Sequence, residues 1–345
     1  MSNLKDVAKK AGVSVTTVSN FINNKKAVKE ETRIKILEAI KDTGYRYNTA
    51  AALLKRNSTE PSTIAIISVV DQNNFFSELF FRLESECFNK GYAVVSCFRQ
   101  EDSNNLKKYI NLISGKVDGI ILISICKDKI DSIIKNVHAI PVVAIAFDIG
   151  SVASLCGGTQ FDLHNQMGGY IAGRYLVAKG HRSLACVTGP ADLKTTKDRI
   201  NGLESALAET GLPVGHIKYI EGDYSYDSGI AAMYALYSSG KLPTAVMCHN
   251  DLMAVGVQNA ASELGIKIPK DMSVMGYDDI ETARMANPPL TTVRIPLENL
   301  ATQAIDELIK KINEPGIPAL ISVNPVLVVR GSVDEPPMDK ARKPE

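Results

Sequence analysis

Short apolar runs alternate with helical stretches from about residue 64 to residue 276, and this alternation limits the fold more than any other feature. The first series has apolar runs at 64–70, 93–98, 119–123 and 142–147, with helical stretches at about 76–90, 104–113 and 129–137. The second series has runs at 184–188, 217–220, 244–247 and 273–276, with helical stretches near 166–179, 199–210, 228–238 and 252–264. Short continuous apolar runs that alternate with helices are typical of the strands of buried parallel sheets. Two series of similar size predict an α/β protein with two doubly wound parallel-sheet lobes.

Residues 4–23 have a different pattern, which predicts two short helices around a tight turn. Leu4, Val7, Ala8 and Ala11 have the spacing of one helical face, and Gly12 supplies the permissive backbone of the turn. The second helix has Ser14 as its expected N-cap and an inner face of Val15 or Val18 with Phe21 and Ile22. A third helix is expected over 30–43, with Ile34, Leu37 and Ile40 inward and Gly44 at its end. This is the pattern of a helix-turn-helix head, whose second helix enters the DNA major groove.

Two interpretations of this pattern are a DNA-binding head and a three-helix bundle that binds nothing, and the charge distribution favours the first. Residues 1–58 hold 12 Lys and Arg against 5 Asp and Glu, a net charge of +7. The remaining residues hold 27 against 33, a net charge of −6. A basic head on an acidic body favours nucleic-acid binding by the head.

The rest of the composition predicts a cytoplasmic protein. The N-terminal residues MSNLKDVAKK contain no apolar signal-peptide core, and no apolar run approaches the roughly 20 residues that span a bilayer. The six cysteines are scattered without a C-x-x-C pair, so we expect free, buried thiols in a reducing compartment.

Five collinear motifs resemble the lac repressor/gal repressor family of bacterial transcriptional regulators. They are the head with its continuation VKEETRIKILEAIKDTGYRYN, then HNDLMAVG (249–256), VMGYDDIE (274–281), PPLTTVR (288–294) and LVVRGS (327–332). The resemblance implies two lobes like those of periplasmic sugar-binding proteins, with an effector between them and three chain crossings. It divides the chain into a head (1–47), a hinge helix and linker (48–61), lobe one (62–160 and 291–320), lobe two (161–290 and 321–332) and a polar tail (333–345).

The resemblance also implies how the chain contacts DNA. Val15, Thr16 and Asn20 match positions that face base edges, and Thr17 and Ser19 match positions nearer phosphates. Lys5, Lys26 and Lys55 are expected phosphate partners, and Leu54 matches the hinge leucine that wedges into a central base step. The hinge departs from the family at Tyr47, where Pro is usual, and at Ala52, where Arg is usual. A bare tether is the alternative for this segment. Each head reads a half-site, so a homodimer on a near-palindromic operator is expected.

The effector site is expected from matching positions in the body. They are Phe75, Phe76, Asp148, Arg199, Tyr224, Asn250, Asp278 and Leu297. Aromatic rings can stack on a sugar or base, Asn and Asp can bond hydroxyls, and the planar fork of Arg199 suits two-point contacts. The structural alternatives are a core role for the two phenylalanines, a turn-capping or bracing role for Asn250 and Asp278, and a surface charge for Arg199.

The chain departs from sugar-binding members in ways that point to a polar effector, neutral or anionic, other than a simple neutral hexose. Ala146 and His164 stand where Asp is common, with Asp148 two residues beyond Ala146 as its expected substitute. Lys194 and Lys197 are close to Arg199 in the sequence. Whether the effector acts as inducer or corepressor is left open.

Catalysis and cofactor binding are not expected. The sequence has no G-x-G-x-x-G, P-loop, H-E-x-x-H or G-x-S-x-G motif, and its five histidines form no i, i+4 pair. The alternatives are a periplasmic-type ligand-binding protein and a sugar-phosphate enzyme. The enzyme would depend on Lys197 with Asp278, the one acid–base pair that the sequence offers.

Overall fold

The computed structural model describes residues 3–22, 28–43, 62–68, 74–98, 112–113, 115–123, 140–145, 158–211, 217–314 and 316–337. The chain divides into two compact units. One comprises residues 1–70, 80–162 and 299–321, and the other comprises residues 71–79, 163–298 and 322–345. None of the helices described is both long and apolar enough to cross a membrane.

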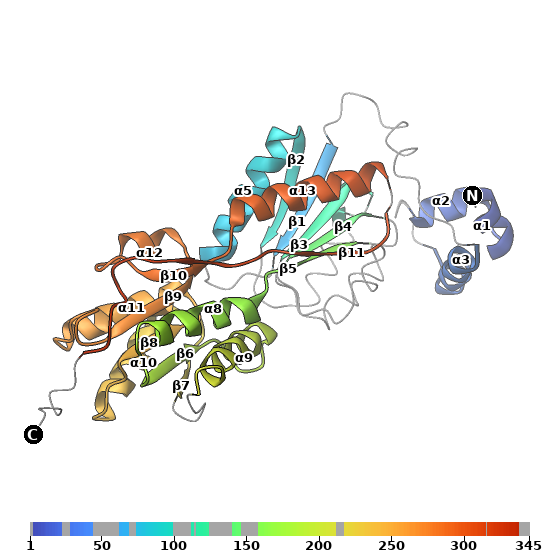
Figure 1. Ribbon diagram of the computed structural model, residues 1–345. Coiled ribbons are helices and arrows are strands. Elements are labelled where there is room, and N and C mark those ends of the chain that lie inside the picture. The colour runs from blue at the N-terminus through green and yellow to red at the C-terminus, as the bar shows by residue number, and fades with distance from the viewer. Residues whose placement is uncertain are drawn as a thin grey trace, which may run out of the picture. The chain divides into compact units, whose positions relative to one another are not determined.

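The head consists of α1 (Leu4–Ala11), α2 (Val15–Ile22) and α3 (Glu30–Thr43), as the sequence predicts (Figure 1). The side chain of Asn3 caps α1, and the left-handed Gly12 (φ 66°) ends it. Ser14 Oγ accepts from the Thr17 N–H at 3.0 Å, so it caps α2 as expected. Predictions that fall on Gly44 and on the hinge lie outside the described residues.

The buried residues of the head show which of the two candidate valines of α2 faces inward, and they correct the predicted inner face of α3. Its buried residues are Val7, Ala8, Ala11, Val18, Ile36 and Ala39. Val18 is therefore the inward residue of α2, while Val15 is 41% exposed. The expected inner face of α3 was wrong in part, because Ile34 is 49% exposed and Ile36 takes its place. The helix is rotated so that Ile36, Ala39 and the partly buried Ile40 share the inner face.

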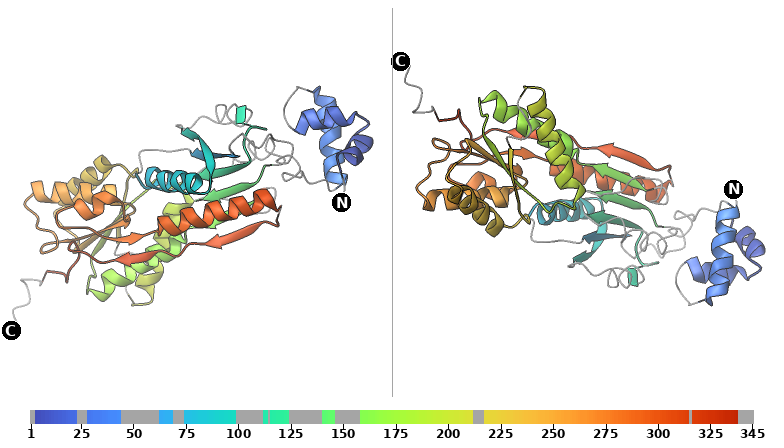
Figure 2. Two further views of the ribbon diagram at one scale, coloured as in Figure 1. Left: turned by 90° about the horizontal axis from the view of Figure 1, so that it is seen from above. Right: turned by 90° about the horizontal axis from the view of Figure 1, so that it is seen from below.

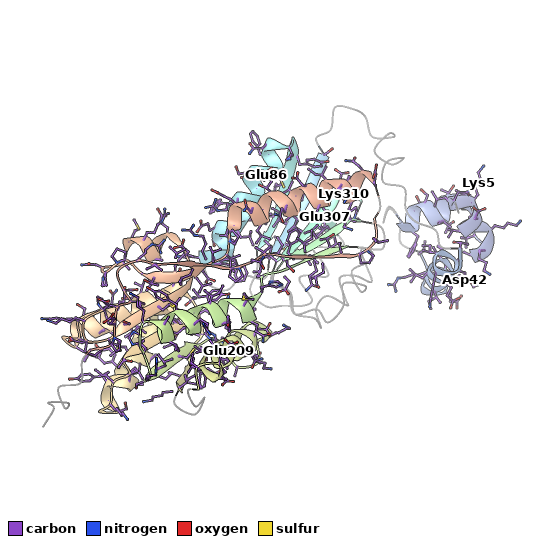
Figure 3. The ribbon with its side chains drawn as sticks, viewed as in Figure 1. Lys5, Asp42, Glu86, Glu209, Glu307 and Lys310 are labelled. Atoms are coloured by element: carbon purple, nitrogen blue, oxygen red, sulfur yellow. The ribbon has the colours of Figure 1, made fainter. Side chains whose placement is uncertain are left out.

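The first unit contains a six-stranded sheet in the order β11-β5-β4-β3-β1-β2. Its strands are β1 (Ser62–Ser68), β2 (Tyr92–Phe98), β3 (Gly119–Ile123), β4 (Val142–Ile145), β5 (Thr159–Asp162) and β11 (Ala319–Ser322). The neighbours from β2 to β5 pair in parallel. Most of α5 (Asn74–Asn89) and most of α13 (Leu297–Asn313) also lie in this unit. Lys90, the residue after α5, donates from Nζ to Asp306 Oδ1 of α13 at 2.7 Å. Glu86, Glu307 and Lys310 lie on these helices (Figure 3).

The second unit contains a six-stranded sheet in the order β12-β10-β9-β8-β6-β7. Its strands are β6 (Leu184–Thr188), β7 (Ile217–Glu221), β8 (Ala245–Cys248), β9 (Ser273–Asp278), β10 (Thr291–Arg294) and β12 (Val326–Val328), and only β12 runs antiparallel to its neighbour. The helices are α8 (Asn165–Ala178), α9 (Lys194–Ala208), α10 (Tyr226–Ser238), α11 (Asp251–Glu263) and α12 (Glu281–Met285). This sheet lies between the α8–α9 pair and the α10–α11 pair (Figure 2).

Three predicted boundaries change. The segment 291–294 was assigned to lobe one, but it forms β10 beside β9, and the chain passes to the first unit after Glu298. Helix α9 begins at Lys194, so Arg199 lies in its second turn and does not open it. The tail expected from residue 333 begins as part of the second unit, because Val333 is buried and Asp334 is hydrogen-bonded to Ser273.

Candidate functional site

The loops at the carboxyl edge of the second sheet contain unusual backbone conformations. Tyr224 follows β7 with φ 68°, Asp278 ends β9 with φ 108°, and Asp279 has φ 59°. His164, which follows β5, has φ 45° and precedes α8 without a side-chain cap bond. Left-handed conformations cost non-glycine residues roughly 1–3 kcal/mol each and cluster at binding sites. The carboxyl edge of a doubly wound sheet is also where such folds bind ligands.

Arg199 is the centre of a cluster at this edge. Its side chain is almost buried, with 8% of the residue exposed. Nε donates to Asn165 Oδ1 at 2.9 Å, and Nη1 donates to the carbonyl oxygen of His249. Nη2 lies 3.7 Å from Asp278 Oδ1, and the guanidinium stacks 3.6 Å from the ring centre of Tyr277. These contacts offset the cost of burying the charge and hold the fork in one orientation.

The burial of this cluster shifts the pKa values of its members. Burial lowers the pKa of Arg199, but Tyr277 and then Asp278 outweigh that effect, so that the pKa is raised and the side chain stays a cation. Burial raises the pKa of Tyr277 to about 12, so the phenol stays protonated. Arg199 and Asp278 therefore form a buried charge pair at this edge.

A second buried carboxylate, that of Asp251, supports the loop that carries Asp278. Asp251 Oδ2 accepts from the Ile280 N–H at 2.9 Å, and Oδ1 accepts from Thr292 Oγ1 at 2.6 Å. Burial, and next the charge of Asp278, raise the pKa of Asp251 well above its usual range. The neighbouring Asp279 accepts from Arg294 Nε at 2.6 Å and Arg330 Nη2 at 2.5 Å.

Tyr224 and Asn250 form the other side of the cluster. The Tyr224 hydroxyl lies 3.0 Å from Thr196 Oγ1, and its ring lies so close to Gly189 that an added Cβ there would be 2.1 Å from Cζ. Asn250 Nδ2 donates to the Tyr224 carbonyl at 2.8 Å, while its Oδ1 accepts from the Met253 N–H at 3.0 Å. The structural alternative for Asn250, a helix cap that braces a turn, is therefore present.

The remaining expected effector residues are less informative. Phe75 is buried and Phe76 partly buried, with ring centres 5.3 Å apart and planes at 80°. Leu297, the first residue of α13, is 7% exposed. Asp148 lies outside the described residues.

The structure does not bring the lysines of α9 into the cluster. Lys194 pairs with Asp198, and Lys197 is exposed and donates to the Asp192 carbonyl at 3.4 Å. These lysines therefore give no support for an anionic effector. Lys197 also does not form the suggested acid–base pair with Asp278. His164 Nδ1 instead lies 3.0 Å from Asn324 Oδ1. In the described part of the chain, no group of three His, Cys, Asp or Glu residues is arranged to hold a metal ion.

Four members of the cluster were missed by the sequence analysis: Asn165, Thr196, His249 and Tyr277. Two of them carry a local signal, because Tyr277 directly precedes Asp278 and His249 directly precedes Asn250. Residues beside an expected contact at a strand end were candidates for that reason alone.

The head presents the start of α2 to solvent. Val15 and Thr16 are exposed, and Thr17, Ser19 and Asn20 are partly exposed. Lys5 projects from the outside of α1 (Figure 3). These are the residues that the sequence analysis assigns to base and phosphate contacts. Lys26, Leu54 and Lys55 lie outside the described residues.

Comparisons with known proteins agree with this architecture. Residues 3–48 match the model of the lacI family of bacterial regulatory proteins, and residues 174–333 match that of a periplasmic binding protein-like domain. The HTH-type transcriptional repressors PurR of Proteus mirabilis and of Photorhabdus laumondii are each 36% identical over 99% of this chain and 100% of their own.

Solved structures give the same result. A lac repressor dimer bound to operator and the anti-inducer ONPF has a TM-score of 0.69 and 25% identity, covering 96% of this chain and 99% of that one. The regulator CelR in complex with cellobiose has a TM-score of 0.68 and 28% identity, covering 96% and 100%. The relatives are transcriptional repressors and not enzymes. The chain is therefore a DNA-binding transcriptional repressor with an effector-binding domain, and it belongs to the lacI family of bacterial regulatory proteins.

Proposed function

We propose that this repressor is controlled by a small, polar, ring-bearing effector that contacts the Arg199 cluster. The observation that carries the proposal is an almost buried Arg199–Asp278 pair at the carboxyl edge of a parallel sheet, beside left-handed residues. Left-handed non-glycine residues cluster at ligand sites, and a buried ion pair by itself is weak evidence for a stabilising role, so both features favour ligand binding at this edge. The solved relatives hold ONPF and cellobiose, both of which fit the proposed class.

The chemistry of the pair defines what the effector offers. The Arg199 fork donates and the Asp278 carboxylate accepts, so a ligand with an acceptor and a hydroxyl or N–H donor on nearby atoms satisfies both. Phe75, Phe76 and Tyr224 supply faces on which a sugar or base ring can stack. The effector is polar, and because Arg199 is already paired with Asp278 it need not be an anion.

Calorimetry with Arg199→Lys tests this site. Lysine keeps the charge but loses the planar fork, so the compound that binds the wild-type chain should bind the variant at least about tenfold more weakly. Lys197→Ala, on the exposed side of the same helix, is the matched control and should bind as the wild type does. Equal affinities for Arg199→Lys and the wild type would reject the site.

On the DNA side, we propose a homodimer that acts in the cytoplasm on a near-palindromic operator. Val15, Thr16 and Asn20 would read bases, and Lys5, Lys26 and Lys55 would contact phosphates. Leu54 would enter a deformable central step. A periplasmic-type ligand-binding protein is the alternative, but it has no use for a capped, basic helix-turn-helix head.

Selection of bound sequences from random duplex DNA tests this proposal. A palindrome with a deformable centre should be enriched. Asn pairs with adenine and Arg prefers guanine, so Asn20→Arg should shift one position of each half-site towards G. An unchanged half-site would reject the assignment of Asn20, and an absence of any enriched site would reject specific readout.

A further inference from the structure

His249 is held in place at the carboxyl edge of the second sheet. It follows β8, its N–H donates to the Val187 carbonyl at 2.9 Å, and its own carbonyl accepts from Arg199. The imidazole is completely buried. Its Nδ1 lies 3.3 Å from the backbone nitrogen of Gly189, the residue against which the Tyr224 ring packs. The ring therefore belongs to the same cluster as Arg199 and Tyr224.

These contacts determine where the imidazole carries its proton. The Gly189 N–H is a donor, so Nδ1 accepts and has no proton. Burial, followed by the charge of Arg199, lowers the pKa of His249 well below its ordinary value, so the ring is neutral at pH 7. A neutral ring with a bare Nδ1 is protonated at Nε2.

The Nε2–H has no hydrogen-bond acceptor among the residues that the structure describes. A buried donor left without an acceptor costs about 1–3 kcal/mol. Such groups are rare in native structures and call for a specific explanation. Here the unpartnered donor lies in the cluster that already contains the guanidinium of Arg199 and the strained Tyr224.

We infer that His249 is a specificity-determining residue, whose Nε2–H donates to an acceptor atom of the effector. This inference rests on the effector site proposed above and adds to it. The imidazole is neutral, so it selects a lone pair and not a charge. The class of ligand is a ring compound whose carbonyl, hydroxyl or ring heteroatom faces His249 while a second acceptor faces Arg199. A ligand that lacks this atom leaves the donor unpaired and is rejected.

Two variants separate the nitrogen atoms of the ring. His249→Asn keeps an acceptor near the position of Nδ1 for Gly189 and removes the Nε2–H. His249→Gln places an amide donor near the position of Nε2. Nitrogen-15 labelling of the histidines of the full chain, with the signal assigned by its loss in His249→Asn, reads the tautomer without ligand. We expect a protonated Nε2 and a bare Nδ1 at pH 7, and a protonated Nδ1 or an imidazolium would overturn the inference.

Calorimetry with ribose, ribose 5-phosphate, gluconate and adenine then tests recognition. For the compound that binds the wild-type chain most tightly, His249→Asn should weaken binding roughly tenfold, and His249→Gln should stay within about threefold. If His249→Asn binds as the wild type does while Arg199→Lys does not, the donor serves a buried water only and the inference fails. If neither variant changes the affinity of a compound that binds the wild-type chain, the proposed effector site fails as a whole.

Discussion

Two buried histidines of the second unit differ in how many of their ring nitrogens are hydrogen-bonded. His181 Nδ1 lies 3.0 Å from Thr244 Oγ1, and its Nε2 lies 2.9 Å from the Asp334 carbonyl. His249 has a bond at Nδ1 and none at Nε2 among the described residues. Burial is the main cause that lowers the pKa of both side chains. His181 therefore acts in stability, where it ties the C-terminal segment to the second unit, and His249 is available for recognition.

The lowered pKa of His181 predicts a loss of stability in mild acid. The folded state binds the proton less readily than the unfolded chain, whose histidines titrate near pH 6.5. The contribution of His181 is thus fully present above about pH 6.5 and is lost as the pH falls below that value. The melting temperature of the full chain should fall between pH 7 and pH 5.5, and His181→Gln should flatten this dependence.

The pKa of His249 is also lowered, so this residue adds to the same loss of stability in acid. The melting temperature of His249→Asn is therefore measured beside that of His181→Gln. If His181→Gln showed the same pH dependence as the wild type, while His249→Asn removed it, the assignment to His181 would be wrong.

The residues of the effector cluster show how far sequence reasoning reaches. Asp278 lies in a quoted motif of the family and Arg199 at a matching position, so the resemblance predicted both. Asn165 and His249, which bond the guanidinium, are 34 and 50 residues away from it along the chain. His249 meets it because parallel strands bring their carboxyl ends to one edge, and Asn165 meets it because α8 packs against α9. No local sequence pattern indicates which side chains then come into contact.

Among the elements, α8 and α9 pack unusually closely, and glycines permit it. A Cβ on Gly169 would lie 2.1 Å from the Arg199 carbonyl oxygen, and one on Gly202 would lie 1.9 Å from the Gln166 carbonyl oxygen. This approach places Asn165, the first residue of α8, within bonding distance of Arg199. The geometry of the Arg199 cluster therefore depends on the close packing of α8 against α9.

Gly202→Ala should accordingly destabilise the chain. The added methyl group must push α8 from α9, a strain of roughly 1–3 kcal/mol that outweighs the gain of up to about 1 kcal/mol in helix propensity. The midpoint of urea unfolding should fall, and the affinity for the effector should fall with it. Ser205→Ala, on the exposed side of α9, is the control and should leave both unchanged. An unchanged midpoint in Gly202→Ala would show that the helices separate without cost.

Elements with continuous apolar runs were predictable, and polar elements were not. The strands β1, β3, β6 and β9 were expected near their observed positions. The strand β10 has the sequence TTVR and β5 the sequence TQFD, and neither forms an apolar run. Their strand conformation depends on pairing with neighbours distant in sequence, so the boundary between the units was misplaced at β10.

For the whole molecule, the separation of charge predicts which lysines govern DNA affinity. Residues 1–58 carry a net charge of +7 and the rest a net charge of −6. Lys5→Ala should weaken operator binding for all sequences alike and reduce the slope of log affinity against log salt by about 1. Lys310→Ala removes an exposed positive charge from the body and should change neither the operator affinity nor the salt slope (Figure 3). Equal slopes for Lys5→Ala and the wild type would remove Lys5 from the phosphate contacts.

The chain carries a DNA-binding head and an effector domain, and a regulatory effector links the binding free energies of the two. A regulatory effector changes the operator affinity by a factor of about 5–150, and the operator must change the effector affinity by that same factor. Both factors can be measured on the full chain, by titrating the selected operator with and without effector and the effector with and without operator. A higher operator affinity with effector would identify a corepressor, and a lower one an inducer. Arg199→Lys should weaken effector binding yet leave effector-free operator binding unchanged. If a tightly bound compound left the operator affinity unchanged, it would bind both states equally and would not be the regulatory effector.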